Sequence, residues 1–204
     1  MTDFLDIKKA RYTVRDYGSR ELERAKLHRI YEAGRWAPTA VNLQPQRIIV
    51  LDGEEGRARI REFTTFRYDP KYAALAAESA DKEREVNSYH YNARIGLLVC
   101  YDSDICWKHP SSGKSSGETD ATIVATHMML EAASIGVGSS WISYFDEDKA
   151  RRLLSIPTRI IPVVLLLLRY PSESSKPNTV VAGKRHPLDQ TVFYGKLCDG
   201  VWER

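Results

Sequence analysis

Three segments of the chain are apolar at almost every position, over lengths that suit β-strands. A strand covered on both faces is continuously apolar, whereas a strand with one wet face alternates between apolar and polar residues. The longest apolar run, at 160–168, is far shorter than the roughly 20 residues that a membrane-spanning helix needs. The pattern predicts buried strands at RIIVLD (47–52), ARIGLLVCYD (93–102) and IIPVVLLLLRYP (160–171), and a strand or strand exit at VGSSWISYF (137–145).

Between these strands, apolar residues recur at helical spacing, which predicts amphipathic helices. Ser19 and Asp146 are the expected N-caps of the second and the last of them. The predicted helices span 3–11, about 21–36, 54–66, 70–88 and 146–156. A further segment, 119–135, is apolar nearly all round, which predicts a helix that is buried on most sides. In a protein of this length, such a helix often lies in a subunit interface.

The alternation of continuously apolar strands with helices predicts a central sheet covered by helices on both faces. The length of 204 residues suits one compact domain with a substantial core, and no repeat or linker divides the chain. A single domain over 1–204 is therefore expected. The segment 103–118 is a polar loop, rich in serine and glycine, that is long enough for a lid or a binding loop.

Composition and charge exclude several classes of function. The net charge of +3 is spread along the chain without a run of lysine and arginine, so a nucleic-acid partner is not expected. The N-terminus lacks the layout of a signal peptide, which favours a cytoplasmic location and no membrane partner. Three cysteines without a CxxC pair argue against a disulfide framework and against a zinc site, and Cys100 is expected in the core.

Four polar elements stand out from this background. In RYTVRDY, two arginines flank a threonine, and two guanidinium groups with a hydroxyl can bind a phosphate, although a solvated helix end has the same composition. In APTAVNLQPQ, short polar side chains precede a buried strand. The other two are GVGSSWISYFD, where small residues lead to a tryptophan at a strand exit, and GKRHPL in the tail.

These four elements, in this order, resemble the motifs of the FMN-dependent nitroreductase family over residues 8 to about 192. The resemblance implies a central, mainly antiparallel sheet flanked by helices, in an intertwined homodimer with two FMN molecules at its interface. Apolar runs do not determine strand direction, so the resemblance adds to the pattern here. Three positions depart from the family motifs: Thr13 stands in place of a serine, Gln46 in place of a tryptophan and Arg169 in place of a glycine.

The resemblance also assigns residues to the phosphate end of FMN. Arg11, Tyr12, Thr13 and Arg15 would meet the phosphate and the ring edge. Arg185 would add positive charge from the tail. A contact from Lys184 stays open, because Gly183 occupies the position at which the family has a lysine.

At the flavin ring, the resemblance assigns two segments. Asn42 and Gln44 would bond the polar edge of the isoalloxazine, while a turn formed by Pro38, Thr39 and Ala40 would approach from the other subunit. One face of the ring would lie along the strand exit formed by Trp141, Ile142, Ser143 and Tyr144, where a backbone N–H near Ser143 could reach the nitrogen that accepts hydride. Loop residues Trp107 and Lys108 are candidates for substrate contacts, or belong to a solvated surface loop.

The implied activity is that of an NAD(P)H-dependent FMN oxidoreductase. NAD(P)H delivers hydride to FMN and leaves, and a nitroaromatic, quinone or similar small-molecule acceptor then takes its place, in a ping-pong mechanism. Because the chemistry belongs to the cofactor, no catalytic side chain and no metal are required. Two alternatives are open: a specialised reductive enzyme of the same fold, such as a dehalogenase or an enone reductase, and a flavin-binding module without turnover.

Overall fold

The computed structural model describes residues 3–67, 86–88, 90–177 and 185–195. Its helices are α1 (Phe4–Ala10), α2 (Arg24–Arg35), α3 (Gly53–Thr64), α4 (Gly117–Ser134) and α5 (Glu147–Leu154), with short 3-10 helices η1 (Ala40–Asn42) and η3 (Leu188–Gln190). Its strands are β1 (Gln46–Leu51), β2 (Thr65–Arg67), β3 (Val86–Ser88), β4 (Ile95–Asp102), β5 (Gly138–Ile142) and β6 (Ile160–Arg169). Each strand predicted from a continuous apolar run is confirmed.

The main sheet has four strands in the order β1-β4-β6-β5, and every neighbouring pair is antiparallel. This confirms the mainly antiparallel sheet that the sequence resemblance implied. Strands β2 and β3 form a separate antiparallel pair. The apolar run at 160–168 lies in β6, between β4 and β5. No helix in the described part of the chain is long and apolar enough to cross a membrane.

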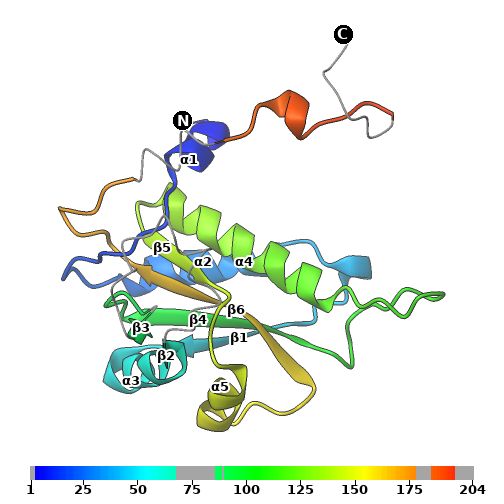
Figure 1. The fold of residues 1–204 in the computed structure, drawn as a ribbon, viewed down its shortest axis with the longest axis horizontal. Helices are drawn as coiled ribbons and strands as arrows, with labels where there is room; N and C mark the ends of the chain where they lie inside the picture. The colour runs from blue at the N-terminus through cyan, green and yellow to red at the C-terminus, as the bar shows by residue number, and fades with distance from the viewer. Residues whose placement is uncertain (1–2, 68–85, 89, 178–184, 196–204) are drawn as a thin grey trace.

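Helices cover both faces of the sheet, as the continuously apolar strands predicted (Figure 1). Alternate residues of β4 point to opposite faces. Leu97 and Val99 pack with α2 and α4, whereas Leu98 and Cys100 pack with α3 and α5. Strand β6 alternates in the same way, so two apolar clusters lie back to back across one sheet. Cys100 is fully buried, which confirms its predicted place in the core.

The helix predictions hold for most of the chain, and Asp146 caps α5 as predicted by accepting the N–H of Lys149 at 2.8 Å. Two predictions are wrong. The N-cap of α2 is Glu23, not Ser19, because Arg169 bonds the carbonyls of Ser19 and Arg20 and the chain becomes helical only at Arg24. Residues 86–88 form strand β3 rather than the end of a helix, and the remainder of 70–85 lies outside the described residues.

Glu23 ties the start of α2 to the end of β6. Its carboxylate accepts the hydroxyl of Tyr170 at 2.6 Å and pairs with Arg20 at 2.6 Å. These hydrogen bonds, the one from Tyr170 first, lower the pKa of Glu23 to about 2.

This lowered pKa gives a testable pH dependence. A depressed carboxylate pKa contributes stability that is present above the unfolded value of roughly 4.3 and is lost as the pH falls towards the folded value. We expect Glu23→Gln to flatten the loss of thermal stability between about pH 4.5 and 2. Melting temperatures of both proteins across this range would measure it, and parallel acid limbs would contradict it.

The N-terminal segment 13–18 extends the sheet beyond β5. Thr13 forms a parallel bridge with Ser139, and the N–H of Val14 donates to the carbonyl of Ser139 at 2.9 Å. Gly138 permits this close approach, because a Cβ there would lie 2.8 Å from Cγ2 of Val14 and 2.9 Å from the carbonyl oxygen of Arg169. The packing of Val14 and Arg169 against the start of β5 therefore explains why the second glycine of the GVGSSW motif is a glycine.

Arg169, one of the departures from the family motifs, closes the sheet at the end of β6. It is only 7% exposed. Its guanidinium donates to the backbone carbonyls of Ser19 at 2.8 Å and of Arg20 and Asn92 at 3.4 Å. One buried side chain therefore holds the segment before α2 and the turn before β4.

Candidate functional site

Two basic side chains, Arg11 after α1 and Arg185 in the tail, lie near enough for their charges to interact. Burial lowers the pKa of Arg11, and the nearby charge of Arg185 lowers it further. Arg11 is half-buried in the first residues after α1, whereas Arg185 is exposed and comes from the tail. Two like charges held close together at a partly desolvated position are the chemistry of an anion site. The family resemblance assigned both residues, which are more than 170 positions apart in the sequence, to the phosphate end of the cofactor.

The other predicted phosphate residues lie in the same region. Thr13 is bridged to Ser139 at the start of β5. The hydroxyl of Tyr12 donates to the backbone carbonyl and side chain of Ser175, both at 3.3 Å. Arg15 is exposed. Lys184 lies outside the described residues. The name "basic cluster" is used below for Arg11, Tyr12, Thr13, Arg15 and Arg185.

A pocket of about 390 Å³ opens beside the basic cluster. Arg11 and Tyr12 line it together with α1, the end of α4 and the start of β5. Most of its wall is apolar; Ile7, Ala10, Val14 and Val137 belong to it. Motif reasoning missed the contribution of α1, because the helical repeat of 3–11 says nothing about a cavity behind it.

The second predicted region is the polar loop, residues 38–45, between α2 and β1. It is held at both ends. The N–H of Ala40 donates to Oδ1 of Asp120 at 2.9 Å, and the carbonyl of Pro45 accepts the N–H of Asp102 at 2.8 Å. Thr39 accepts the N–H of Gln44 on its Oγ1 at 3.1 Å, which closes the loop on itself.

The backbone of the polar loop is left-handed at Val41, Asn42 and Gln44, with φ of 51°, 55° and 51°. This region is unfavourable for residues with a Cβ, and for β-branched valine most of all. Pro38, Asn42 and Gln44 are exposed. The loop therefore presents the predicted flavin-edge side chains to solvent from a constrained backbone.

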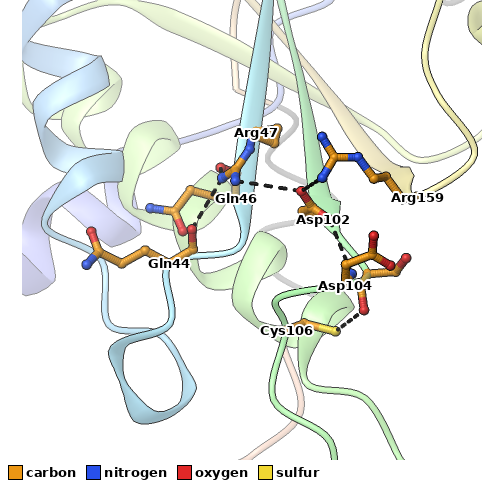
Figure 2. A network of polar contacts seen from close by, with 8 residues as sticks. Gln44, Gln46, Arg47, Asp102, Asp104, Cys106 and Arg159 are labelled. Carbon is orange, nitrogen blue, oxygen red and sulfur yellow. Dashed lines mark hydrogen bonds and ion pairs between the residues drawn. The ribbon is translucent and has the colours of Figure 1, made fainter.

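The carboxylates that anchor this loop were not predicted as functional. Asp120 is 2% exposed and Asp102 is 1% exposed. Each has a sequence signal in retrospect: Asp120 is an acid within an almost wholly apolar helix, and Asp102 ends a continuously apolar strand. Figure 2 shows Asp102 between the guanidinium groups of Arg47 and Arg159, at 3.7 and 2.9 Å.

The strand exit that follows β5 offers mainly backbone and polar atoms. Ile142 is 6% exposed and its side chain packs in the core, so only its backbone remains for a ligand. Trp141 is half-buried and donates from Nε1 to Oγ of Ser143 at 2.8 Å. Ser143 and Tyr144 are exposed. Ser143 also lines a second pocket, of about 270 Å³, together with Tyr101 and Phe145.

The loop 103–116 is a hairpin rather than an irregular segment. Lys108 bridges to Ser115, and the N–H of His109 donates to the carbonyl of Lys114 at 2.9 Å. Trp107 is half-buried and meets the His109 ring edge to face, whereas Lys108 is exposed. Both predicted substrate residues therefore lie on an ordered arm that projects from the body of the protein (Figure 1).

Helix α4 separates the two predicted regions. The polar loop is bonded to Asp120 in its first turn, and the pocket beside the basic cluster is lined by Ala133 and Ser134 in its last. At 1.5 Å per residue, these points are roughly 20 Å apart along the helix. Figure 1 shows α1 near one end of α4 and η1 near the other. One chain therefore does not bring the basic cluster and the polar loop together.

No group of three or more metal-ligating side chains occurs among the residues that the structure describes. Cys100 and Cys106 are buried and free, and Cys198 lies outside the described residues. The polar groups available for chemistry are thus the basic cluster, the polar loop and the strand exit.

Comparison with known proteins gives one consistent family. The model of the nitroreductase family matches residues 9–168. A nitroreductase family protein of Clostridium difficile 630 superposes with a TM-score of 0.80 at 32% identity, covering 96% of this chain and all of that one.

Two further relatives carry more specific names. A protein of Methanothermobacter thermautotrophicus, provisionally named as an NADH dehydrogenase/NAD(P)H nitroreductase, is 28% identical over 176 residues, which are 84% of this chain and 79% of the relative. An FMN-dependent nitroreductase of Clostridium difficile R20291 shares the fold, with a TM-score of 0.66 at 19% identity, covering 95% of this chain and 99% of that one.

Proposed function

The chain belongs to the nitroreductase family, and from that premise we propose that it is an NAD(P)H-dependent oxidoreductase that carries FMN. The observation that carries the proposal is the position of Arg11, half-buried in the wall of the pocket beside α1 and β5 and near enough to Arg185 to feel its charge. Two guanidinium groups that repel each other, one of them half-buried, are stabilised when an anion binds between them. The 5′-phosphate of FMN is such an anion, so the residues present fit the group that the family implies.

The basic cluster would hold the phosphate end of FMN. Arg11 and Arg185 supply positive charge, and Arg15 adds a third guanidinium from an exposed position. The Thr13 hydroxyl is a neutral partner for a phosphate oxygen. The hydrogen bonds of Tyr12 to Ser175 hold the segment 172–177 beside this site.

The polar loop and the strand exit would hold the ring. Asn42 and Gln44 offer amide donors and acceptors that match the polar edge of an isoalloxazine. The strand exit offers the Ser143 backbone N–H, which can donate to a ring nitrogen. When bound, the flavin supplies the redox chemistry, taking hydride from NAD(P)H and passing it to an acceptor, while the protein binds and orients it.

A homodimer would complete the site. The basic cluster and the polar loop lie at opposite ends of α4, so one chain alone cannot present both to one cofactor. Helix α4 keeps Ile123, Met129 and Leu130 partly exposed, which gives it an apolar face for a second copy. If two α4 helices pair antiparallel, the loop of one subunit approaches the basic cluster of the other, and Pro38–Ala40 can touch the partner's cofactor.

The electron acceptor would be a small oxidising molecule, and nitroaromatics and quinones are the first candidates. The hairpin 103–116 is placed to contact them, because its last residue is bonded to the same carboxylate as the polar loop: Ser116 donates to Asp120 at 2.8 Å. Trp107 offers an aromatic surface and Lys108 a positive charge. A dehalogenase or an enone reductase of the same fold would differ at this arm.

Stopped-flow absorbance of the purified protein with NADH and then NADPH tests the proposal. We expect a yellow protein whose flavin absorbance bleaches on mixing and returns when a nitroaromatic or a quinone is added. A yellow protein that neither nucleotide bleaches would favour a binding module without turnover. A colourless protein that takes up no added FMN would contradict the assignment of the cofactor.

A further inference from the structure

The polar loop adopts an unfavourable backbone conformation between two sets of contacts with the rest of the fold. Three residues with side chains, Val41, Asn42 and Gln44, lie in the left-handed region within four positions. Such conformations persist where the surrounding structure determines them. The contacts that fix this loop are made by other residues of the same chain.

The first fixing contact is Asp120. Its buried carboxylate accepts the N–H of Ala40 at 2.9 Å on one oxygen and the hydroxyl of Ser116 at 2.8 Å on the other. Burying a carboxylate costs free energy unless hydrogen bonds to its oxygens compensate for the lost water. Asp120 thus joins helix α4, the base of the hairpin 103–116 and the start of the left-handed stretch.

The second fixing contact is Arg47, on the other side of the stretch. Its Nη1 donates to the carbonyl of Gln46 at 2.8 Å and to that of Gln44 at 3.4 Å, and its Nη2 lies 3.7 Å from Oδ2 of Asp102. Figure 2 shows this chain of contacts running from Gln44 to Asp102. The same oxygen of Asp102 also accepts Nη1 of Arg159 at 2.9 Å, so the anchor of Arg47 is itself held in place.

We propose that Asp120 and Arg47 are positioning residues that hold the polar loop in its left-handed form before the cofactor arrives. The inference rests on the proposed function, in which Asn42 and Gln44 contact FMN. A loop that populates its binding form only part of the time binds more weakly in proportion to that fraction. The two anchors lie on either side of the residues that would contact the ring, and neither needs to touch FMN itself.

Asp120→Ala is the first test, and Asp120→Asn is its conservative partner. The alanine removes the acceptor of the Ala40 N–H. The asparagine keeps an acceptor oxygen for Ala40, and its amide can donate to Ser116. We expect Asp120→Ala to weaken FMN binding about tenfold, as a drop of the binding-competent fraction to about one tenth would do. Asp120→Asn should stay within about threefold of the wild type.

Arg47→Met is the second test, because its site is partly exposed and the fold tolerates its loss more readily than a buried change. It removes both carbonyl contacts and keeps the apolar stem. Ile60→Val, on the buried face of α3, is the control for a general loss of stability. FMN affinity is measured by quenching of flavin fluorescence, and amide hydrogen exchange of 39–45 is measured in the protein without FMN.

The two measurements separate positioning from a structural role. We expect faster exchange over 39–45 and weaker FMN binding in Asp120→Ala and Arg47→Met, and neither effect in Ile60→Val. Wild-type FMN affinity and exchange in both anchor variants would overturn the inference while leaving the proposed function intact. A wild-type protein that binds no FMN would instead overturn the proposed function, and the exchange measurement would still report whether the anchors hold the loop.

Discussion

Replacing Arg11 with alanine should weaken FMN binding by roughly 1.5–3 kcal/mol, the range for loss of a hydrogen bond to a charged group. This corresponds to a loss of roughly 10- to 150-fold in affinity. Arg185→Ala should act in the same direction. Because both guanidinium groups would meet one phosphate, the double variant should lose less than the sum of the two single losses. Isothermal titration with FMN would measure all three.

The melting temperature of the FMN-free protein is a control, because the same substitutions should not lower it. Arg11 and Arg185 repel each other there, and each loss relieves that repulsion, so Arg185→Ala should leave the melting temperature of the FMN-free protein unchanged or slightly raised. A binding defect in such a variant cannot come from poor folding. Arg24→Ala, at an exposed position in α2, removes an equal charge away from the site. FMN affinity that is unchanged in both Arg11→Ala and Arg185→Ala would remove the phosphate role.

Arg169→Met should lower the free energy of unfolding by roughly 2–4 kcal/mol, because it removes three hydrogen bonds that a buried, charged side chain donates to backbone carbonyls. Arg169 donates to three of them, at Ser19, Arg20 and Asn92. In a chain of this size, the expected fall in melting temperature is roughly 4–16 °C. Thermal unfolding followed by circular dichroism would measure it.

Two further variants sharpen this prediction. Arg169→Gly installs the residue that the family motif carries at this position, and we expect it to destabilise this chain as well, because the surrounding carbonyls here are arranged for a guanidinium. Arg152→Ala removes an exposed arginine from α5 and should change stability little. Equal melting temperatures for Arg169→Met and Arg152→Ala would show that the hydrogen bonds of Arg169 make no net contribution to the stability of the fold.

Much of the fold could be predicted because short stretches of sequence determine most of its strands and helices. Continuous apolar runs predicted β1, β4 and β6, and the helical repeats predicted α1 to α5. Ser19 was misassigned as a cap because a cap is judged from local sequence, whereas the carbonyl of Ser19 is bonded by Arg169, which is 150 positions away. Strand direction was likewise outside the reach of the pattern and came from the resemblance.

The candidate site divides in the same way. Arg11 and Arg185 were predicted to converge because the order of the motifs resembles a known family, and the structure places them close together. The left-handed backbone at Val41 had no sequence signal, since valine is among the residues least suited to it. Asp120 carried a signal, an acid in a mostly apolar helix, but its partner Ala40 bonds through a backbone N–H that every residue except proline possesses.

The docking of the segment 13–18 onto the sheet also has a consequence for synthesis. The Tyr17 hydroxyl donates to the carbonyl of Leu167, 150 positions later in the chain. At a translation rate of 5–20 residues per second, the segment waits roughly 8–30 s for its partner strand to be made. Until then Tyr17 lacks this hydrogen bond, and β4 and β5 lack β6, the strand that pairs with both, so their edges stay open to other strands. Assembly of the basic cluster is thus among the last events on the ribosome, and a chain stopped before β6 is complete would carry an unprotected strand edge into the cell.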